Sequence, residues 1–347
     1  MRYSKRWIST PLALLLAMAA CSSVAPRGPA TPHGPVSYPL PAAPMPQPSD
    51  NWPIPPLDAE VTMRSCELST HYEWPAGGGV TGARKVAFYS PTLGRQFLAK
   101  WKAAPRRLES WNNSPRRELA AYAVQKLFLD PEDYVVPPSV MRCAPLEEYR
   151  LIIDRSAEPT IEGTECVLGN LSLWMENVTI PKVFYDEKRF ATDPNYALRM
   201  GNFNLLTFII DHKDGRRGNF LVSKNEADRR VFAIDNGISF DAWIFNYFVQ
   251  NWNDLRVPAL SKHSVDRLRE VTPEQVEALA VVAELQVMAN GLVESVLPVG
   301  APLSTRQGVR QQDGVIQFGL TADEIDDVME QIEEVVEGVD DGKIPVF

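Results

Sequence analysis

Cysteine and histidine are scarce in this sequence, which has four of each among 347 residues. They form no cluster with the spacing of a zinc site, so a zinc-stabilised module is not expected. An excess of positive charge is also missing, because 35 lysines and arginines face 44 acidic residues and the net charge is −9. An acidic chain attracts neither nucleic acid nor a bare anionic membrane surface, so nucleic acid is not expected as a partner.

The first 20 residues have the pattern of a secretory signal. Arg2, Lys5 and Arg6 precede an apolar run over residues 11–20, and basic residues before a short apolar core are typical of export signals. The run is too short to cross a bilayer, which takes about 20 apolar residues. Residues 1–20 are therefore predicted to be a cleaved signal.

Cys21 follows two alanines directly after this run. The junction resembles the lipobox of bacterial lipoproteins, although Met18 stands where leucine is usual. The resemblance implies cleavage before Cys21, acylation of its thiol and attachment to a lipid bilayer. Ser22 is not an aspartate, which by the sorting rule of that family favours the outer membrane. The alternative is an ordinary cleaved signal that contains a cysteine.

Residues 21–57 consist mainly of proline, alanine, serine and glycine. Proline-rich stretches stay extended and bury little, so this segment is predicted to be a linker between the lipid and a folded part. The folded part would start near Asp58, and its length allows one large domain or two lobes. In an oxidising compartment, one pair among Cys66, Cys143 and Cys166 could form a disulfide. Cys143 with Cys166 is favoured because both lie in strand-like segments of one lobe.

The folded part begins with strands and continues with helices. Alternating residues predict strands at 85–90 and 96–102, and Ser114-Pro115 predicts the start of a helix that continues to Leu129. Three further strands are expected, and then helices, one of them from Pro273 to Met288 and another from Ala322. The strands are placed at 135–136, 149–153 and 171–175. This order predicts an α+β protein with a strand-rich lobe at 58–180 and a mostly helical lobe at 181–347.

Several residue patterns occur in a specific order. A strand ending at Lys100-Trp101-Lys102 precedes a helix with Glu118 in its first turn. A strand into Trp174-Met175-Glu176 follows. Then an apolar helix leads to Asp214, an asparagine follows five residues later at Asn219, and the stretch 231–240 contains Ile234-Asp235-Asn236-Gly237.

This order resembles the protein-kinase-like superfamily over residues 77–243. The branch it resembles holds the phosphatidylinositol 3-/4-kinases and the bacterial HipA-type kinases. The resemblance implies a two-lobed kinase-like fold that binds ATP and magnesium. Lys102 would hold the phosphates, with Lys100 as a rival, and Glu118 would fix that lysine by an ion pair. Backbone groups of Trp174, Met175 and Glu176 would bind adenine.

The resemblance also assigns the chemistry. Asp214 would accept the proton of the attacking hydroxyl, and Asn219 with Asp235 would supply oxygen ligands to Mg²⁺. The glycine turn with Gly78, Gly79 and Gly82 lies where a phosphate-covering loop belongs, although such clusters are often only turns. His212 and Gly215 depart from the family pattern, and Asp211 is a second candidate for the base. The alternative for the whole segment is a hairpin with an Asn-Gly turn and incidental acids.

Two classes of function follow. The first is an ATP- and Mg²⁺-dependent phosphotransferase, tethered to the bacterial envelope, that acts on a hydroxyl of an envelope protein, lipid or glycan. The second is a catalytically inactive kinase-like scaffold or binding lipoprotein. The enzyme is favoured because the lysine, the glutamate, the two aspartates and the asparagine of the family pattern are all present. The scaffold is favoured by the low ATP content expected of the periplasm. A structural envelope lipoprotein without a nucleotide site is a third possibility.

Overall fold

A computed structural model describes residues 34–40, 49–66, 68–69, 82–91, 93–240 and 252–347. All of them belong to one compact unit, residues 33–347. The predicted signal, Cys21, Gly78 and Gly79 lie outside the described residues. None of the helices in the described ranges combines the length and the apolar character needed to cross a bilayer.

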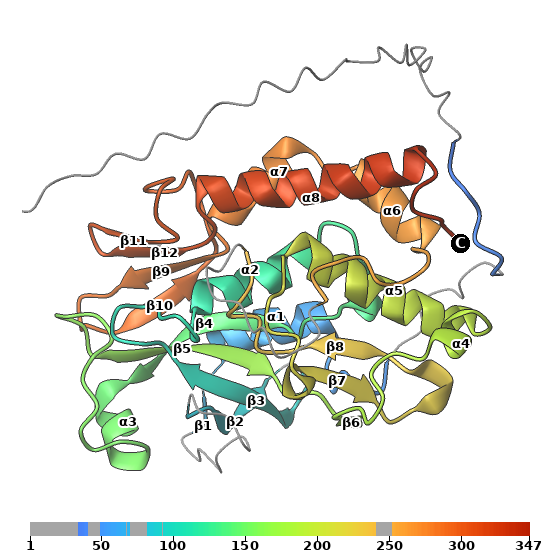
Figure 1. Cartoon of the computed structure of the whole chain (residues 1–347). Coiled ribbons are helices and arrows are strands. Elements are labelled where there is room, and N and C mark those ends of the chain that lie inside the picture. Colours follow the sequence, from blue (N-terminus) through green and yellow to red (C-terminus); the bar gives the residue numbers. More distant parts are fainter. Residues whose placement is uncertain (1–33, 41–48, 67, 70–81, 92, 241–251) are drawn as a thin grey trace, which may run out of the picture. The chain divides into compact units, whose positions relative to one another are not determined.

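The described residues form a mixture of helices and antiparallel strands (Figure 1). The helices are α1 (Pro56–Ser65), α2 (Pro115–Gln125), α3 (Leu146–Ile152), α4 (Glu187–Phe190), α5 (Pro194–Ile209), α6 (Lys262–Arg269), α7 (Pro273–Glu277) and α8 (Ala322–Asp340). The strands are β1 (Leu68–Ser69), β2 (Arg84–Ser90), β3 (Arg95–Ala103), β4 (Ser139–Pro145), β5 (Cys166–Leu173), β6 (Val178–Thr179), β7 (Phe220–Ser223), β8 (Val231–Ala233), β9 (Ala283–Val287), β10 (Val293–Val296), β11 (Val309–Gln312) and β12 (Val315–Phe318).

The strands form three sheets, in the orders β1-β2-β3-β5-β4, β6-β7-β8 and β10-β9-β12-β11. Each recorded strand pair is antiparallel. The mixed α and β composition predicted from the sequence is therefore confirmed. The third sheet packs against β4, and α8 packs against α5, α6 and α7 (Figure 1).

Strand β3 has one face in the hydrophobic core and one face toward a pocket. Side chains alternate between the faces of a strand, so Phe97, Ala99 and Trp101 are buried together in the core. Lys100 and Lys102 point to the opposite face, where they line a pocket. Gly169 on β5 makes room for this packing, because a Cβ atom there would lie 2.5 Å from the ring of Trp101.

Helix α2 begins at Pro115 as predicted but ends at Gln125, before Leu129. The side-chain oxygen of Gln125 accepts hydrogen bonds from the amides of Val135 and Val136, each 2.8 Å long. These two valines were predicted to form a strand. The Gln125 side chain thus binds both amides, while the Val135 carbonyl accepts from the Ala233 amide of β8 over 3.0 Å. The two valines belong to no strand, and the next strand starts at Ser139.

Two further elements differ from the prediction. Residues 149–153 were expected as a strand, but Tyr149 lies in helix α3, which buries Leu146 and Tyr149 at helical spacing. The helix expected from Pro273 to Met288 ends at Glu277. Residues 283–287 form β9 instead, because both edges of this segment pair with strands, β10 and β12. Tertiary pairing has overridden the apolar spacing that indicated a helix.

The folded unit also begins earlier than the predicted boundary at residue 58. Asn51 is completely buried, as is nearly all of Trp52 and Ile54, and the Trp52 ring packs edge-on against Phe232 with the centroids 5.1 Å apart. Farther upstream, the Tyr38 amide donates to the carbonyl of Val346 over 2.7 Å. The described parts of the proline-rich segment therefore pack on the folded unit, because they contain apolar side chains among the prolines.

Cys143 and Cys166 form a disulfide between the paired strands β4 and β5, with Cα atoms 5.3 Å apart. This is the pairing that the sequence favoured, and Cys66 remains a buried thiol. The Val293 amide of β10 contacts Cys166 Sγ at 3.1 Å. The C-terminal sheet therefore packs on the strand-rich part, which the predicted division at residue 180 did not anticipate.

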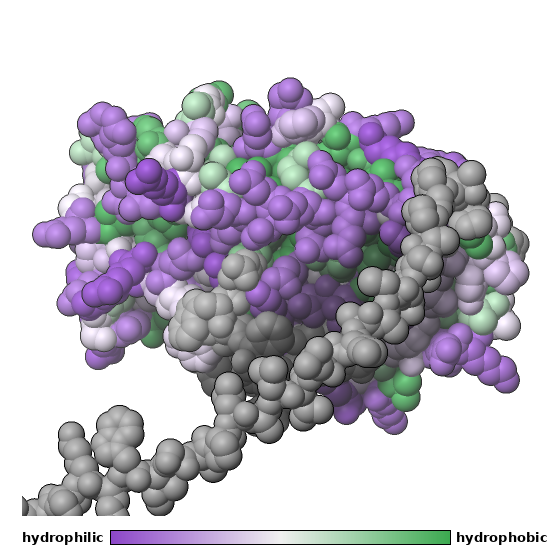
Figure 2. All heavy atoms as spheres, turned by 45° about the horizontal axis from the view of Figure 1, so that its top comes forward, coloured by the Kyte–Doolittle hydropathy of each residue, from purple (hydrophilic) through white to green (hydrophobic). Residues whose placement is uncertain are grey.

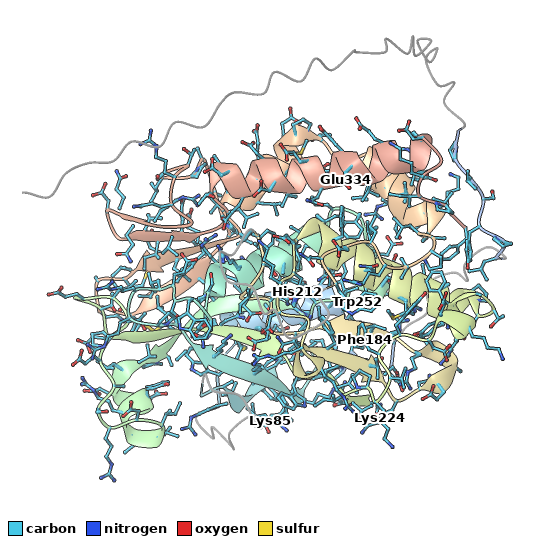
Figure 3. All side chains as sticks on the ribbon, viewed as in Figure 1. Lys85, Phe184, His212, Lys224, Trp252 and Glu334 are labelled. Carbon is cyan, nitrogen blue, oxygen red and sulfur yellow. A yellow bond between two sulfur atoms is a disulfide. The ribbon has the colours of Figure 1, made fainter. Side chains whose placement is uncertain are left out.

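An aromatic cluster supports the loop that follows α5. Phe203 of α5, Phe220 of β7, Phe184 and Trp252 have ring centroids 4.8–5.8 Å apart. Figure 3 shows Phe184, His212 and Trp252 in the interior. The cluster packs α5 against strand β7 of the β6-β7-β8 sheet.

Helix α8 begins with a capping box formed by Thr321 and Glu324, as its sequence predicted. Its inner face buries Ile325, Val328 and Ile332. The outer face is acidic, and the side of the molecule around α8 is largely hydrophilic (Figure 2).

Candidate active site

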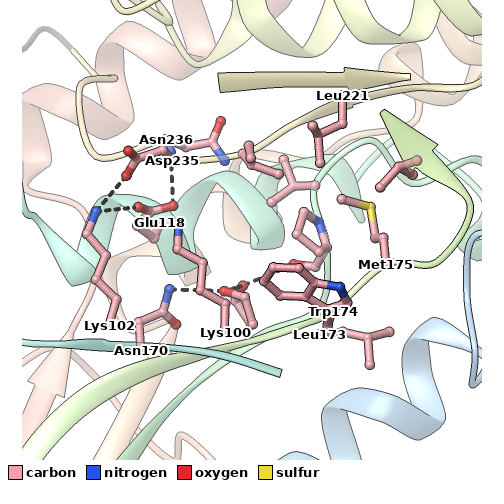
Figure 4. A pocket seen from close by; sticks show the side chains of 16 residues that line it. Lys100, Lys102, Glu118, Asn170, Leu173, Trp174, Met175, Leu221, Asp235 and Asn236 are labelled. Carbon is pink, nitrogen blue, oxygen red and sulfur yellow. Dashed lines mark hydrogen bonds and ion pairs between the residues drawn. The ribbon is translucent and has the colours of Figure 1, made fainter. Parts of the chain in front are cut away.

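A pocket lies between the β3–β5 part of the first sheet and the β7–β8 strands, with α2 at one end (Figure 4). It holds about 660 Å³ of empty space, part of which is open to solvent. The residues around it come from both sheets and from the segment after β8. They are Lys100, Lys102, Glu118, Val136, Pro137, Ser139, Asn170, Ser172, Leu173, Trp174, Met175, Val178, Leu221, Ile234, Asp235 and Asn236.

Lys102 is the centre of the polar end of this pocket. Its ammonium lies 3.1 Å from Glu118 of α2 and 2.6 Å from Asp235, and the side chain is only 2% exposed. Glu118 also accepts a hydrogen bond of 2.9 Å from the Asn236 amide. Figure 4 shows these three interactions converging. The structure therefore joins three predicted site residues and selects Lys102 over Lys100 as the partner of Glu118.

Pairing with opposite charges keeps Lys102 and Asp235 ionised. Burial alone would lower the pKa of Lys102, but the carboxylates of Glu118 and Asp235 outweigh it and raise that pKa. Burial would likewise raise the pKa of Asp235, yet Lys102 and Lys100 hold it well below its ordinary value. Asp235 has a φ of +63°, which is uncommon for a residue with a side chain. Its ion pair with Lys102 helps to hold this conformation.

The loop after α5 brings Asp214 and Asn219 together. The Asn219 side-chain amide donates to the Asp214 carboxylate over 2.8 Å and to its carbonyl over 3.0 Å. Both side chains are buried. The Asn219 side chain thus bridges the five residues back to Asp214 and orients its carboxylate.

Arg216 connects this loop to the lysine end of the pocket. Its guanidinium is 3.1 Å from Asp214, 3.1 Å from the side-chain oxygen of Asn219 and 3.5 Å from Asp235. The side chain is half-exposed. One cation therefore contacts oxygens of the predicted base, Asp214, and of both predicted metal ligands, Asn219 and Asp235.

The competing residues of the loop have other contacts. Asp211 pairs with Lys213 at 2.8 Å and accepts from Asn253 at 2.9 Å. His212 is fully buried against Phe220, and burial lowers the pKa of its ring. Neither ring nitrogen of His212 has a hydrogen-bond partner among the described residues. The structure places Asp214, rather than Asp211, beside Asn219.

The predicted adenine-binding backbone is only partly free. The Trp174 amide donates to the Leu98 carbonyl over 3.0 Å. Glu176 donates its amide to the Asn51 carbonyl, and its own carbonyl accepts from the Asn51 side chain, each over 3.0 Å. Met175 lines the pocket, and its amide and carbonyl have no partner among the described residues. Met175 is therefore the one of the three whose two backbone groups remain for a ligand.

Asn51 is a site-supporting residue that the sequence did not reveal. It was assigned to the linker, and its two contacts with Glu176 cross 125 residues of chain. The signal that could have found it is the cluster of apolar residues around it, Trp52 and Ile54, which is unusual in a linker.

The remaining predicted residues occupy different places. Lys100 lines the pocket opposite Ser172 of β5, and its ammonium has no ion-pair partner among the described residues. Lys85 of β2 stacks over the Trp174 ring at 4.1 Å. Gly82 has a φ of +66° and does not line the pocket, so its predicted contact with phosphate stays a prediction.

The oxygen atoms at the polar end fit a hard cation. The part of the chain that the structure describes has no group of three or more His, Cys, Asp and Glu residues that could cage a metal. However, Mg²⁺ is commonly held by one or two carboxylates while substrate phosphates and water complete its shell. Asp235 and Asn219 already share the cationic Arg216, so both present oxygens toward positive charge.

The sequence matches no protein-family model and no curated protein.

Proposed function

We propose that this protein is an ATP-dependent phosphotransferase with a two-lobed protein-kinase-like fold, tethered to the bacterial envelope. The observation that carries the proposal is the joint placement of Lys102, Glu118 and Asp235 at the polar end of one pocket, with Asp214 and Asn219 linked to them through Arg216. These residues come from four separate segments of the chain. Their chemical types are those that kinases use to bind ATP and Mg²⁺ and to transfer the phosphoryl group.

The pocket would hold the nucleotide along its length. Val136, Leu221 and Ile234 provide apolar surface for a base, and the free backbone of Met175 offers one donor and one acceptor at that end. Lys102 lies at the other end, fixed by Glu118, and the unpaired ammonium of Lys100 lies beside it. Two lysines on one strand face would neutralise the phosphate oxygens.

In this proposal Asp214 acts as the base. The residue is 4% exposed, and the Asn219 side chain donates to one of its carboxylate oxygens. An acceptor hydroxyl would lose its proton to Asp214 while its oxygen forms a bond to the γ-phosphorus and the bond to the ADP oxygen breaks. Asn219 and Asp235 would hold Mg²⁺, which supplies charge neutralisation at the phosphates when bound.

The envelope location rests on the sequence and one structural feature. Disulfides persist in oxidising compartments such as the bacterial periplasm, and the Cys143–Cys166 bond suits that setting. Acylated Cys21 would attach the protein to a bilayer, most simply the outer membrane, facing the periplasm or the cell surface. The acceptor would then be a hydroxyl of an envelope molecule.

A second candidate is an inactive kinase-like scaffold, and Arg216 is the observation that favours it. Its guanidinium contacts the same oxygens that a metal would use. In a scaffold this contact would be permanent. In an enzyme Arg216 would leave these oxygens when metal and nucleotide bind.

The two candidates differ in phosphate transfer. The mature chain, produced without lipid, would be incubated with Mg²⁺ and γ-labelled ATP, alone and with isolated bacterial envelopes. The enzyme predicts labelled product that is lost in Asp214→Asn, because that variant cannot accept the proton. Equal labelling by both proteins, or none by either, would contradict the proposal.

A further inference from the structure

A buried ion pair joins the pocket helix α2 to the C-terminal helix α8. Arg116 lies on α2 two residues before Glu118 and is 5% exposed. Its guanidinium donates to both carboxylate oxygens of Glu324, over 2.5 and 2.9 Å. A third bond of 2.9 Å reaches Glu109. This geometry is the two-pronged pairing that Arg and carboxylate form most specifically.

The acceptor of this pair is itself fixed. Glu324 is 7% exposed and lies in the first turn of α8. It accepts from the Thr321 amide over 2.9 Å and from Arg117 over 3.1 Å. Burial would raise the pKa of Glu324, but its bonds to Arg116 lower it, so the carboxylate stays charged. The start of α8 therefore presents a rigid anion to α2.

The surrounding chain leaves space for the pair. A Cβ atom on Gly308 would lie 2.4 Å from the Arg116 side chain, and the Gly319 carbonyl accepts from Arg116 at 3.4 Å. The residue before β11, Gly308, and the residue after β12, Gly319, therefore both pack closely on the side chain of Arg116. Glu118, two residues after Arg116, is the residue of α2 that lines the pocket among the described residues.

We propose that Arg116 is a positioning residue through which α8 controls the pocket: its ion pair with Glu324 sets α2 so that Glu118 reaches Lys102. This inference rests on the proposed function, because it makes nucleotide binding depend on the C-terminal helix. The physical basis is that a helix is stiff over two residues, so displacement of Arg116 displaces Glu118. Anything that moves the start of α8 would then weaken the Lys102–Glu118 pair.

The test uses a mild change and a matched control. Glu324→Gln keeps the capping box, which accepts Glu or Gln, but removes the charge that Arg116 binds. Glu284→Gln is the control, because Glu284 is also 7% exposed, lies in the C-terminal sheet and accepts a hydrogen bond from Gln317 over 2.9 Å. Both would be compared with Glu118→Gln and with the double variant Glu118→Gln/Glu324→Gln in the full mature chain.

Two readouts are needed. The first is the Kd for Mg²⁺-ATP, which should rise about tenfold in Glu324→Gln, in the range seen when a positioning partner is lost. The double variant should bind no more weakly than Glu118→Gln alone, because both changes act through the same residue. The second is hydrogen exchange of the Asn236 amide without nucleotide, which should become faster in Glu324→Gln, since that amide donates to Glu118.

Glu284→Gln should change neither readout. Independent, multiplying effects of Glu118→Gln and Glu324→Gln on Kd would overturn the inference, as would an Asn236 exchange rate that stays at the wild-type value in Glu324→Gln. If the wild-type chain binds no nucleotide, the proposed function fails, and the Asn236 exchange alone decides whether α8 positions Glu118.

Discussion

Lys102 and Lys100 lie on the same face of β3, but their surroundings differ. Lys102 neutralises two largely buried carboxylates, whereas Lys100 has no ion-pair partner among the described residues. Loss of one member of a buried ion pair leaves an uncompensated charge, which costs about 3–5 kcal/mol. Lys100 acts on Asp235 without forming an ion pair with it, so its loss carries a much smaller penalty. Substituting Lys102 should therefore affect folding stability, whereas substituting Lys100 should affect mainly ligand binding.

Lys102→Met should lower the free energy of unfolding by about 3 kcal/mol. Glu118 then loses its cationic partner, and Asp235 keeps only the half-exposed Arg216 at 3.5 Å as an ion-pair partner among the described residues. Lys100→Met should change it by less than about 0.5 kcal/mol but still weaken Mg²⁺-ATP binding. Urea unfolding and calorimetric titration of the two variants check this. Equal losses of stability would show that the two lysines are not distinguished as the structure indicates.

The charge state of the pocket makes a prediction on pH. The pKa of Lys102 is raised and that of Asp235 is lowered, so Lys102 stays protonated and Asp235 stays ionised across neutral pH. Above pH 7 a phosphate has already lost its second proton, whose pKa is about 6. The Kd for Mg²⁺-ATP should thus vary by less than about twofold between pH 7 and 9. A loss of affinity with a midpoint inside this range would mean that the lysine is not ion-paired.

At the scale of elements, local patterns were sufficient where a segment has one buried face. The alternation in 96–102 and the Ser114-Pro115 start gave β3 and α2, and with them the placement of Lys102 and Glu118. Asp214, Asn219 and Asp235 were selected by the resemblance to the kinase-like superfamily, and the structure connects them through Arg216.

Elements and contacts that depend on distant partners were not readable. Strand β9 forms because β10 and β12 flank it, and Val135 is held by the side chain of Gln125 and by the amide of Ala233 in β8. The pair of Arg116 with Glu324 spans 208 residues. No local pattern distinguishes such residues from solvated charges, so their role emerges only from the packing.

Packing between β3 and β5 gives a prediction for one glycine. Gly169→Ala should destabilise the protein by about 1–3 kcal/mol, because the added methyl group would lie 2.5 Å from the Trp101 ring and overpack the sheet that carries Lys102. Gly218→Ala is the control, since no atom lies within 4 Å of a Cβ there. Denaturant midpoints of the two variants should differ clearly, and similar midpoints would contradict the packing described for Trp101.

At the scale of the whole unit, segments from both ends of the chain support the pocket. Asn51 holds the backbone of Glu176, and Trp52 packs on Phe232 in β8. From the other end, α8 holds α2 through Arg116. The proposed nucleotide pocket is thus enclosed by a fold that extends beyond the segments that supply Lys102, Glu118 and Asp235.

A chain that begins at Asp58, the boundary indicated by composition, should be less stable than one that begins at residue 34. The shorter chain lacks Asn51, Trp52 and Ile54, and loss of large buried side chains costs about 3 kcal/mol or more. Thermal unfolding of the two chains checks this. Identical melting temperatures would show that the proline-rich segment is a linker after all.

Binding of Mg²⁺-ATP in this pocket underlies the proposed activity, and calorimetric titration of the mature chain with nucleotide measures it. Asp235→Asn is the informative variant, because it removes one proposed metal ligand charge, and Glu333→Gln on the exposed face of α8 is the control. We expect saturable, Mg²⁺-dependent binding that Glu333→Gln retains and Asp235→Asn loses. Absence of binding at millimolar nucleotide, or equal binding by Asp235→Asn, would contradict it.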